Sequence, residues 1–148
     1  MKKFIVIAIA TLAFAATVAA QPRAIGIRGA WGAELSYQHS FGNNFIEGDL
    51  GWAPNSISVA AAYDFVFANV GICNFYAGPG AQIGVFKTTN SEGAVASGLN
   101  LGILGQVGCE FELPSVPVNI SIDWRPVFNL INPGFLPQYA GVGIRYRF

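Results

Sequence analysis

The chain has 148 residues and no net charge at pH 7, because eight basic residues balance eight acidic ones. That length suits one domain and not several. The composition is 53% hydrophobic and 11% charged, with no excess of positive charge, which argues against nucleic acid as a partner.

Residues 1–20 have the pattern of a secretory signal peptide. Two lysines come first, the apolar run Phe4–Ala16 follows, and small residues lead up to an expected cleavage after Ala20. The apolar run is shorter than the about 20 residues that a membrane-spanning helix needs, and no cysteine stands directly after the cleavage point to carry a lipid anchor. We therefore expect an exported protein whose mature domain is residues 21–148.

Apolar and polar residues alternate along the mature domain, and nothing in it has the period of a helix. Alternation over short segments predicts strands, since successive side chains of a strand point to opposite faces. The first two segments would also suit one long bent strand, which would leave seven; the even strand number of bacterial barrels favours eight. The predicted strands are Ala24–Ala30, Ala33–Ser40, Asn44–Trp52, Ser56–Phe67, Asn74–Phe86, Gly98–Glu112, Val118–Arg125 and Gln138–Phe148.

The charged residues of every predicted strand fall on its polar face. In Val118–Arg125, for example, Ile120 and Ile122 alternate with Ser121 and Asp123. A soluble barrel turns its apolar face inward, whereas a membrane barrel turns it toward lipid. The apolar face here is the larger and is aromatic near the strand ends, as in the interfacial girdles of membrane proteins. We therefore predict an all-β fold, an eight-stranded antiparallel up-and-down transmembrane β-barrel, with a soluble lipocalin-like ligand-binding barrel as an alternative. The expected girdle residues are Trp31, Trp52, Tyr63, Phe65, Phe67, Phe111, Trp124, Tyr146 and Phe148.

Several stretches resemble the small eight-stranded outer-membrane β-barrel proteins of Gram-negative bacteria. They are AIGIRGAWGAELSYQHSFGNNFIEGDLGW, NFYAGPGAQIGVF, LGILGQVGCEF, SIDWRP and the terminal YRF, and the likeness extends over essentially the whole mature domain. The resemblance implies residence in outer-membrane lipid and insertion by the outer-membrane assembly machinery. It supplies no catalytic residue, and we expect no cofactor and a monomer at the cell outer membrane. The C-terminal strand resembles the signal that the assembly machinery recognises, with outward residues Val142, Ile144, Tyr146 and Phe148.

The polar face of the predicted barrel gathers four arginines and six carboxylates in a narrow interior. Such charges must be paired or hydrogen-bonded, because desolvating a lone ion is very costly. Since the first strand closes against the last, Arg28 is expected beside the strand of Arg145 and Arg147, with Glu34 and Asp123 offsetting the positive charge. The network serves either as a structural plug or as an ion or proton path, and eight strands, which leave just enough room for side chains, favour the plug. Its predicted members are Arg28, Glu34, Glu47, Asp49, Asp64, Glu110, Asp123, Arg125, Arg145 and Arg147, with Gln38, Gln82 and Gln106.

Two long connections are predicted on the outside, because membrane barrels have short periplasmic turns and longer outer loops. Lys87–Ser97 is small and polar. Pro126–Pro137 (PVFNLINPGFLP) is apolar, which predicts either a docking surface for an extracellular partner or lipid, or a loop folded over the barrel mouth.

Enzyme chemistry has little support in the sequence. His39 is the only histidine, and no spacing places a serine or cysteine nucleophile beside it. The Cys and His clusters of a metal site are missing, and Gly78–Gly84 lacks the helix that must follow a phosphate-binding loop. We predict a protein that is not an enzyme and has a structural or surface-interaction role; the alternative is a narrow channel for ions or small solutes.

The two cysteines are predicted near the same rim of the barrel. If the fifth and sixth strands form a hairpin, Cys109 lies opposite Phe75 and two positions from Cys73. The two thiols pair in the oxidising periplasm if their Cα atoms lie within about 7 Å, or else remain small unpaired apolar residues.

Overall fold

The computed structural model describes residues 23–30, 32–89, 91–131, 133–137 and 139–148. The predicted signal peptide, Trp31 and Gln138 lie outside the described residues. Ten strands lie within them: β1 (Arg23–Gly29), β2 (Ala33–Phe41), β3 (Asn44–Ala53), β4 (Ser56–Val70), β5 (Cys73–Thr89), β6 (Val95–Glu112), β7 (Val118–Trp124), β8 (Val127–Asn129), β9 (Gly134–Leu136) and β10 (Ala140–Arg147).

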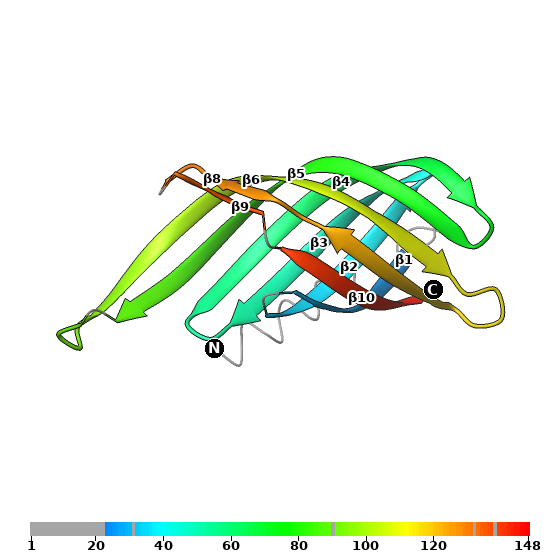
Figure 1. The fold of residues 1–148 in the computed structure, drawn as a ribbon. Coiled ribbons are helices and arrows are strands. Elements are labelled where there is room, and N and C mark those ends of the chain that lie inside the picture. The colour runs from blue at the N-terminus through cyan, green and yellow to red at the C-terminus, as the bar shows by residue number, and fades with distance from the viewer. Residues whose placement is uncertain (1–22, 31, 90, 132, 138) are drawn as a thin grey trace.

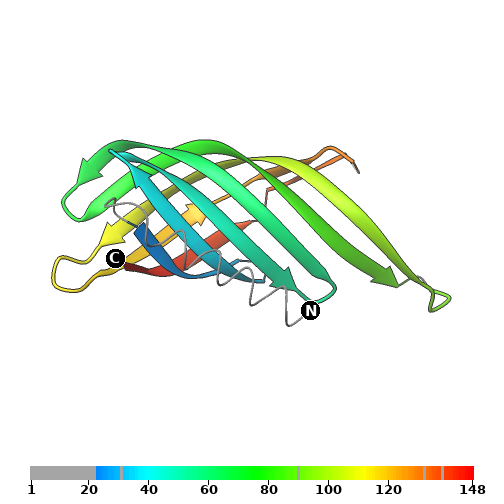
Figure 2. The ribbon, with the colours of Figure 1, turned by 180° about the vertical axis from the view of Figure 1, so that it is seen from behind.

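The strands form one closed antiparallel barrel (Figure 1). From β1 to β7 each strand pairs with the next, and β10 closes the ring between β7 and β1, where Gly29 faces Val142. The strands of the rear wall run side by side at a common tilt (Figure 2), as closure of a barrel requires. The predicted all-β, eight-stranded antiparallel barrel is therefore confirmed.

Ten strands make an eight-stranded barrel because two positions in the ring are each split in two. β8 continues β7 along β6 without a change of register, since Val107 faces Trp124 and Leu104 faces Val127. The break falls at Pro126, which has no N–H to give to the ladder.

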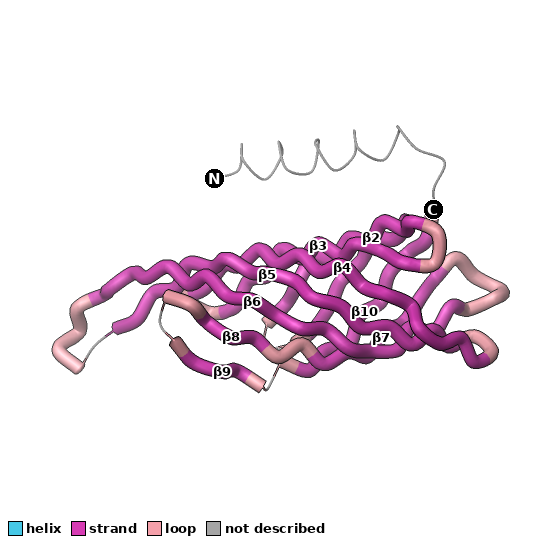
Figure 3. Tube along the Cα trace, turned by 90° about the horizontal axis from the view of Figure 1, so that it is seen from above, coloured by secondary structure: helices cyan, strands magenta, loops and turns pink. Residues whose placement is uncertain are grey.

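The eighth position consists of β9 followed by β10. Val127 faces Leu136, whereas Trp124 faces Ala140, so the register shifts by one residue between the two strands. β9 pairs with β8 alone among the described strands, and Figure 3 shows β8 and β9 beside β6 at one end of the barrel.

The prediction that Pro126–Pro137 is a loop is wrong, because β8 and β9 lie within it. β6 is 18 residues long and outlasts β7, so it supplies a pairing partner beyond Trp124. The apolar residues of this segment are those of a barrel wall: Val127 is fully buried, while Phe128 and Phe135 face outward. The other long connection is shorter than predicted, since β5 and β6 remain paired out to Thr89 and Val95.

We call the barrel end that carries the C-terminus and the β2–β3, β4–β5 and β6–β7 turns the base, and the opposite end the mouth. The first two base turns have Gly42 and Gly71 at φ 63° and 61°, a backbone conformation that glycine adopts without strain. At the mouth, the β5–β6 hairpin extends well past the other strands (Figure 1).

The polarity of this barrel is inside-out relative to a soluble protein. On β10, Val142, Ile144 and Tyr146 are 51–54% exposed, whereas Arg145 between them is 1% exposed. The same alternation recurs around the ring, with aromatic Trp52, Phe65, Phe67, Trp124 and Phe148 among the exposed outer residues.

Candidate functional site

Arg28 binds two carboxylates in the upper part of the barrel interior. Its Nη1 donates to Glu34 at 2.7 Å, and its Nε donates to Asp123 at 3.0 Å, with another bond from Nη2 to the same carboxylate. Glu34 sits directly opposite Arg28 on the neighbouring strand β2. All three guanidinium nitrogens are therefore bonded to carboxylates.

A glycine on β10 lets Arg28 reach Asp123, which lies two strands away on β7. Gly141 faces Asp123 in the ladder, and the Arg28 guanidinium lies over it. A Cβ at Gly141 would stand 2.6 Å from Arg28 Cζ. A side chain at this position would force the Arg28 guanidinium to shift from its place beside Asp123.

Arg125, which follows β7, crosses the interior to β3. Its Nη2 donates to Glu47 at 2.8 Å and to Asp49 at 2.7 Å, and its Nε donates to Gln106 at 2.8 Å. Its Nη1 lies 3.6 Å from Glu34, which joins it to the Arg28 group.

Glu47 connects Arg125 to the third buried arginine. Arg145 Nη2 lies 3.0 Å from Glu47, while its other nitrogens donate to the hydroxyls of Ser36 and Ser121 at 2.8 and 2.7 Å. Ser121 lies on β7, which pairs directly with the Arg145 strand β10, and Ser36 lies on β2, on the other side of β10 beyond β1.

Amide side chains continue the hydrogen-bonded chain toward the base. Gln38 donates to Glu47 at 2.9 Å and to Glu110 at 3.3 Å, and Asn119 donates to Glu110 at 2.6 Å. Gln106 donates to Asp64 at 3.3 Å. Together with the three arginine groups these residues form what we call the interior network: Arg28, Glu34, Ser36, Gln38, Glu47, Asp49, Asp64, Gln106, Glu110, Asn119, Ser121, Asp123, Arg125 and Arg145.

Arg147 lies apart from the interior network, although it was predicted with it. It pairs at the base with Glu112 at 3.1 Å, and the two side chains are 31% and 45% exposed. The hydroxyls of Ser36 and Ser121 and the amide of Asn119 belong to the network but were not among its predicted members. Each of these residues occupies a position of its strand that points inward, and this alternation could have identified it as an interior residue.

An aromatic pair packs in the interior beside the network. Phe45 on β3 and Tyr76 on β5 are both buried, with ring centroids 5.1 Å apart and planes at 71°. Tyr76 is fully buried, and a Cβ at Gly108 would stand 2.7 Å from its hydroxyl. Neither residue was among those predicted for the interior.

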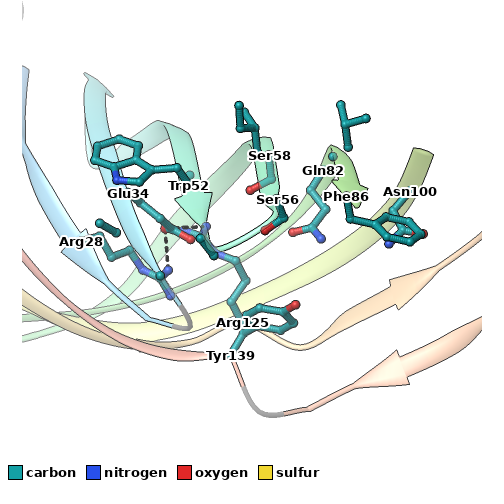
Figure 4. A pocket seen from close by; sticks show the side chains of 17 residues that line it. Arg28, Glu34, Trp52, Ser56, Ser58, Gln82, Phe86, Asn100, Arg125 and Tyr139 are labelled. Atoms are coloured by element: carbon teal, nitrogen blue, oxygen red, sulfur yellow. Dashed lines mark hydrogen bonds and ion pairs between the residues drawn. The ribbon is translucent and has the colours of Figure 1, made fainter. Parts of the chain in front are cut away.

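Above the network lies a cavity of about 110 Å³ at the mouth (Figure 4). Arg28, Glu34 and Arg125 lie at one side of it, and Phe86 and Tyr139 are among its lining residues. Its polar lining also includes Ser56, Ser58, Gln82 and Asn100. An apolar layer of Ala60, Ala62, Leu104 and Val127, with Leu136 and Tyr139 against it, packs inside the barrel at this end.

The remaining predicted residues lie on the outer face or at the base. Cys109 faces Phe75, as predicted from the hairpin register, and Cys73 faces Phe111; both thiols are free. His39 lies among outer aromatic rings, 4.7 Å from the centroid of Phe41, and not in the interior.

No helix long and apolar enough to cross a bilayer occurs in the described part of the chain. Nor do the described residues contain three or more His, Cys, Asp or Glu side chains grouped to hold a metal ion.

Known structures share this fold. The crystal structure of Neisserial surface protein A (NspA) superposes with a TM-score of 0.61 at 13% identity, covering 86% of this chain and 94% of that one. Ail, the attachment invasion locus protein of Yersinia pestis, gives 0.51 at 16% identity, covering 86% and 99%. Ail in complex with the heparin analogue sucrose octasulfate gives 0.50 at 16% identity, covering 86% and 94%. No family model matches the sequence, and a search of curated proteins finds no match. At these identities the likeness establishes the small eight-stranded outer-membrane barrel fold.

Proposed function

We propose that the mature domain is an integral outer-membrane barrel with a structural or surface-interaction role and no catalytic activity. One observation carries the proposal: a closed ring of strands has arginines and carboxylates buried inside and isoleucine, valine and leucine exposed outside. In water, such a surface would be an aggregation hazard. In a bilayer the apolar band faces lipid, and closure leaves no unpaired strand edge at its core.

The mouth is the end that we place outside the cell. The base turns are short, the C-terminus and Arg23, the first described residue, lie at the base, and the longest hairpin is at the mouth, as in bacterial barrels. A surface interaction would therefore use the β5–β6 hairpin and the rim around it, in place of the predicted docking loop at 126–137. The presence of NspA and Ail among the fold's neighbours supports such a role.

The described part of this barrel has no site suited to a heparin analogue such as the one in the Ail complex. A polysulfate needs free basic side chains, and Lys87 is the only lysine after residue 20. Arg28 and Arg125 at the mouth are already bonded to carboxylates.

Membrane fractionation combined with gel migration of unheated and boiled samples tests the proposal. A folded membrane barrel stays with the outer membrane after an alkaline wash and runs differently before and after boiling. Recovery in the soluble periplasmic fraction, still folded, would instead support the lipocalin-like alternative.

The channel alternative has no observation in its favour, because the interior network and the Phe45–Tyr76 pair fill the described interior below the mouth cavity. Discrete, reproducible conductance of the refolded protein in a planar bilayer would overturn that assignment.

Insertion is proposed to depend on the outward residues Val142, Ile144, Tyr146 and Phe148 of the last strand. The first three are exposed on the outer face of β10, and Phe148 follows directly, also exposed. Phe148→Ser is expected to leave more unassembled protein in the periplasm than Phe67→Ser, which alters an equally outward aromatic residue of β4. Equal assembly of the two variants would argue against a special role for the terminus.

We also propose that Cys73 and Cys109 pair after export. They lie diagonally on the same outer face of β5 and β6, within the reach of diagonal neighbours in a ladder. Identical gel mobility of the reduced and unreduced protein, unaltered by Cys109→Ser, would show that they remain thiols.

A further inference from the structure

Four polar side chains in the mouth cavity have no side-chain hydrogen-bond partner among the residues that the structure describes. Ser56 and Ser58 from β4, Gln82 from β5 and Asn100 from β6 line one side of the cavity (Figure 4). Among the described residues no side-chain hydrogen bond is formed to any of them, and Asn100 Oδ1 is a buried oxygen without a partner. In the interior network below, by contrast, each side chain makes at least one side-chain hydrogen bond, although single atoms such as Asp49 Oδ1 and Asp64 Oδ1 have none. Buried polar groups are normally hydrogen-bonded, so this concentration of unused donors and acceptors points to a ligand.

The charged groups beside the cavity exclude an ionic ligand. Arg28 donates from all three nitrogens to Glu34 and Asp123, and Arg125 is held by Glu47, Asp49 and Gln106. Glu34 in turn lies within 4 Å of both arginines, at 2.7 and 3.6 Å. A phosphate or sulfate would have to displace a carboxylate, and a cation would have to displace an arginine. The free hydrogen-bonding groups are all uncharged amides and hydroxyls.

Aromatic rings supply the rest of the cavity wall. Phe86 lines it together with Tyr139, which lies between β9 and β10 (Figure 4). Ring faces attract the C–H groups of a saccharide ring, and amides and hydroxyls bond its O–H groups. An acyl chain would leave the four polar side chains unsatisfied, which costs about 1–3 kcal/mol for each buried group.

The size of the cavity limits the ligand to a single ring. Its 110 Å³ is several times the about 10–15 Å³ that one water molecule needs, but well below the about 300–1,000 Å³ of pockets for drug-sized molecules.

From these features we infer that the mouth cavity binds one neutral polyhydroxylated ring, such as a single sugar residue. Gln82 and Asn100 bond its hydroxyls together with Ser56 and Ser58, and Phe86 and Tyr139 pack against its faces. The sugar comes either from solution or from a neutral core sugar of lipopolysaccharide in the same membrane. The inference depends on the barrel fold and not on the proposed surface role, so each can fail alone.

Saturation-transfer NMR and equilibrium dialysis on refolded protein test the inference, with glucose and N-acetylglucosamine as neutral probes and inorganic sulfate as the anionic one. The detergent must be zwitterionic, because the headgroup of an alkyl glycoside is itself a sugar ring. We expect both sugars to bind and sulfate not to bind. The double variant Gln82→Ala/Asn100→Ala should bind about four- to a hundredfold more weakly, since each neutral hydrogen bond contributes about two- to tenfold in affinity.

Thr88→Ala, on the hairpin beyond the cavity, is the matched control and should bind as the unaltered protein does. Heat-modifiable migration shows which variants fold, and Ser58→Leu, which fills the cavity without removing either amide, serves as a second loss-of-binding variant. Displacement of the probe by full-core lipopolysaccharide but not by lipid A identifies the membrane source, and no displacement by either identifies a soluble one. Sulfate binding, equal sugar binding by the folded double variant, or the absence of binding to any sugar, free or in lipopolysaccharide, would overturn the inference.

Discussion

Replacing Arg28 by methionine is expected to destabilise the folded barrel strongly. Methionine nearly preserves the length of the side chain but removes the guanidinium group. Asp123 has no other side-chain hydrogen-bond partner among the described residues, so its carboxylate would remain buried and unpaired. Breaking a buried ion pair by removing one partner costs about 3–5 kcal/mol. We expect a loss of that size in the free energy of unfolding.

Two further variants separate the ion pair from other effects of the substitution. Arg28→Met/Asp123→Leu should recover about half of the loss or more, because replacing both partners of a buried pair by apolar residues is often neutral. Arg147→Met removes a pair whose side chains are 31% and 45% exposed, together with a bond to the carbonyl of Leu113, and should cost no more than about 1–2 kcal/mol.

The measurement is urea unfolding in lipid vesicles, followed by tryptophan fluorescence and confirmed by gel migration without boiling. The reasoning is refuted if Arg28→Met costs no more than Arg147→Met, or if the double variant is no more stable than Arg28→Met. Either result would mean that the buried charges are solvated or rearranged instead of being held as the structure shows.

Three other predictions test the packing, the orientation and the lipid face. Gly141→Ala should cost about 1–3 kcal/mol in the same unfolding assay, because its Cβ would meet Arg28, whereas Gly48→Ala, with nothing within 4 Å, should be nearly neutral. A membrane-impermeant amine reagent should label Lys87 on intact cells and label the Lys87→Arg variant much less; equal labelling only after the outer membrane is opened would invert the proposed orientation. Ile144→Lys should cost up to about 2–4 kcal/mol in vesicles, depending on its depth, and a neutral effect would contradict lipid contact there.

Alternation made the barrel predictable, because the pleat of a strand fixes which residues share a face. The register of the longest hairpin also followed from its boundaries, and Phe75 faces Cys109 as predicted. Closure places β1 beside the last strand, so Arg28 was expected near Arg145 and Arg147 before any side chain had been placed. These inferences need only local periodicity and the requirement that a ring close.

The failures have a non-local cause. Pro126 and the residues near it have the composition of a loop, yet they form wall because β6, more than 20 positions earlier in the chain, is long enough to pair with them. Similarly, nothing near Arg125 in the sequence indicates that it reaches Glu47 and Asp49, 78 and 76 positions away. Such pairings depend on the length of the side chains and on glycines in the neighbouring strands, which leave room for a long side chain to pass over them.

The interior network gives this barrel a unique register that its outer face does not specify. On the lipid side, β1 and β10 offer Ile25, Ile27, Val142 and Ile144, which are nearly interchangeable under a shift of two positions. Inside, Arg28 now faces Gly143, and a shift by two in one direction would bring it opposite Arg145. Like charges directly opposite one another are destabilising, and both arginines would leave their present partners. A shift by one residue would turn the arginines of β10 toward lipid, at about 2–4 kcal/mol for each one near the midplane. The apolar face therefore selects the environment, and the buried charges select the strand pairing.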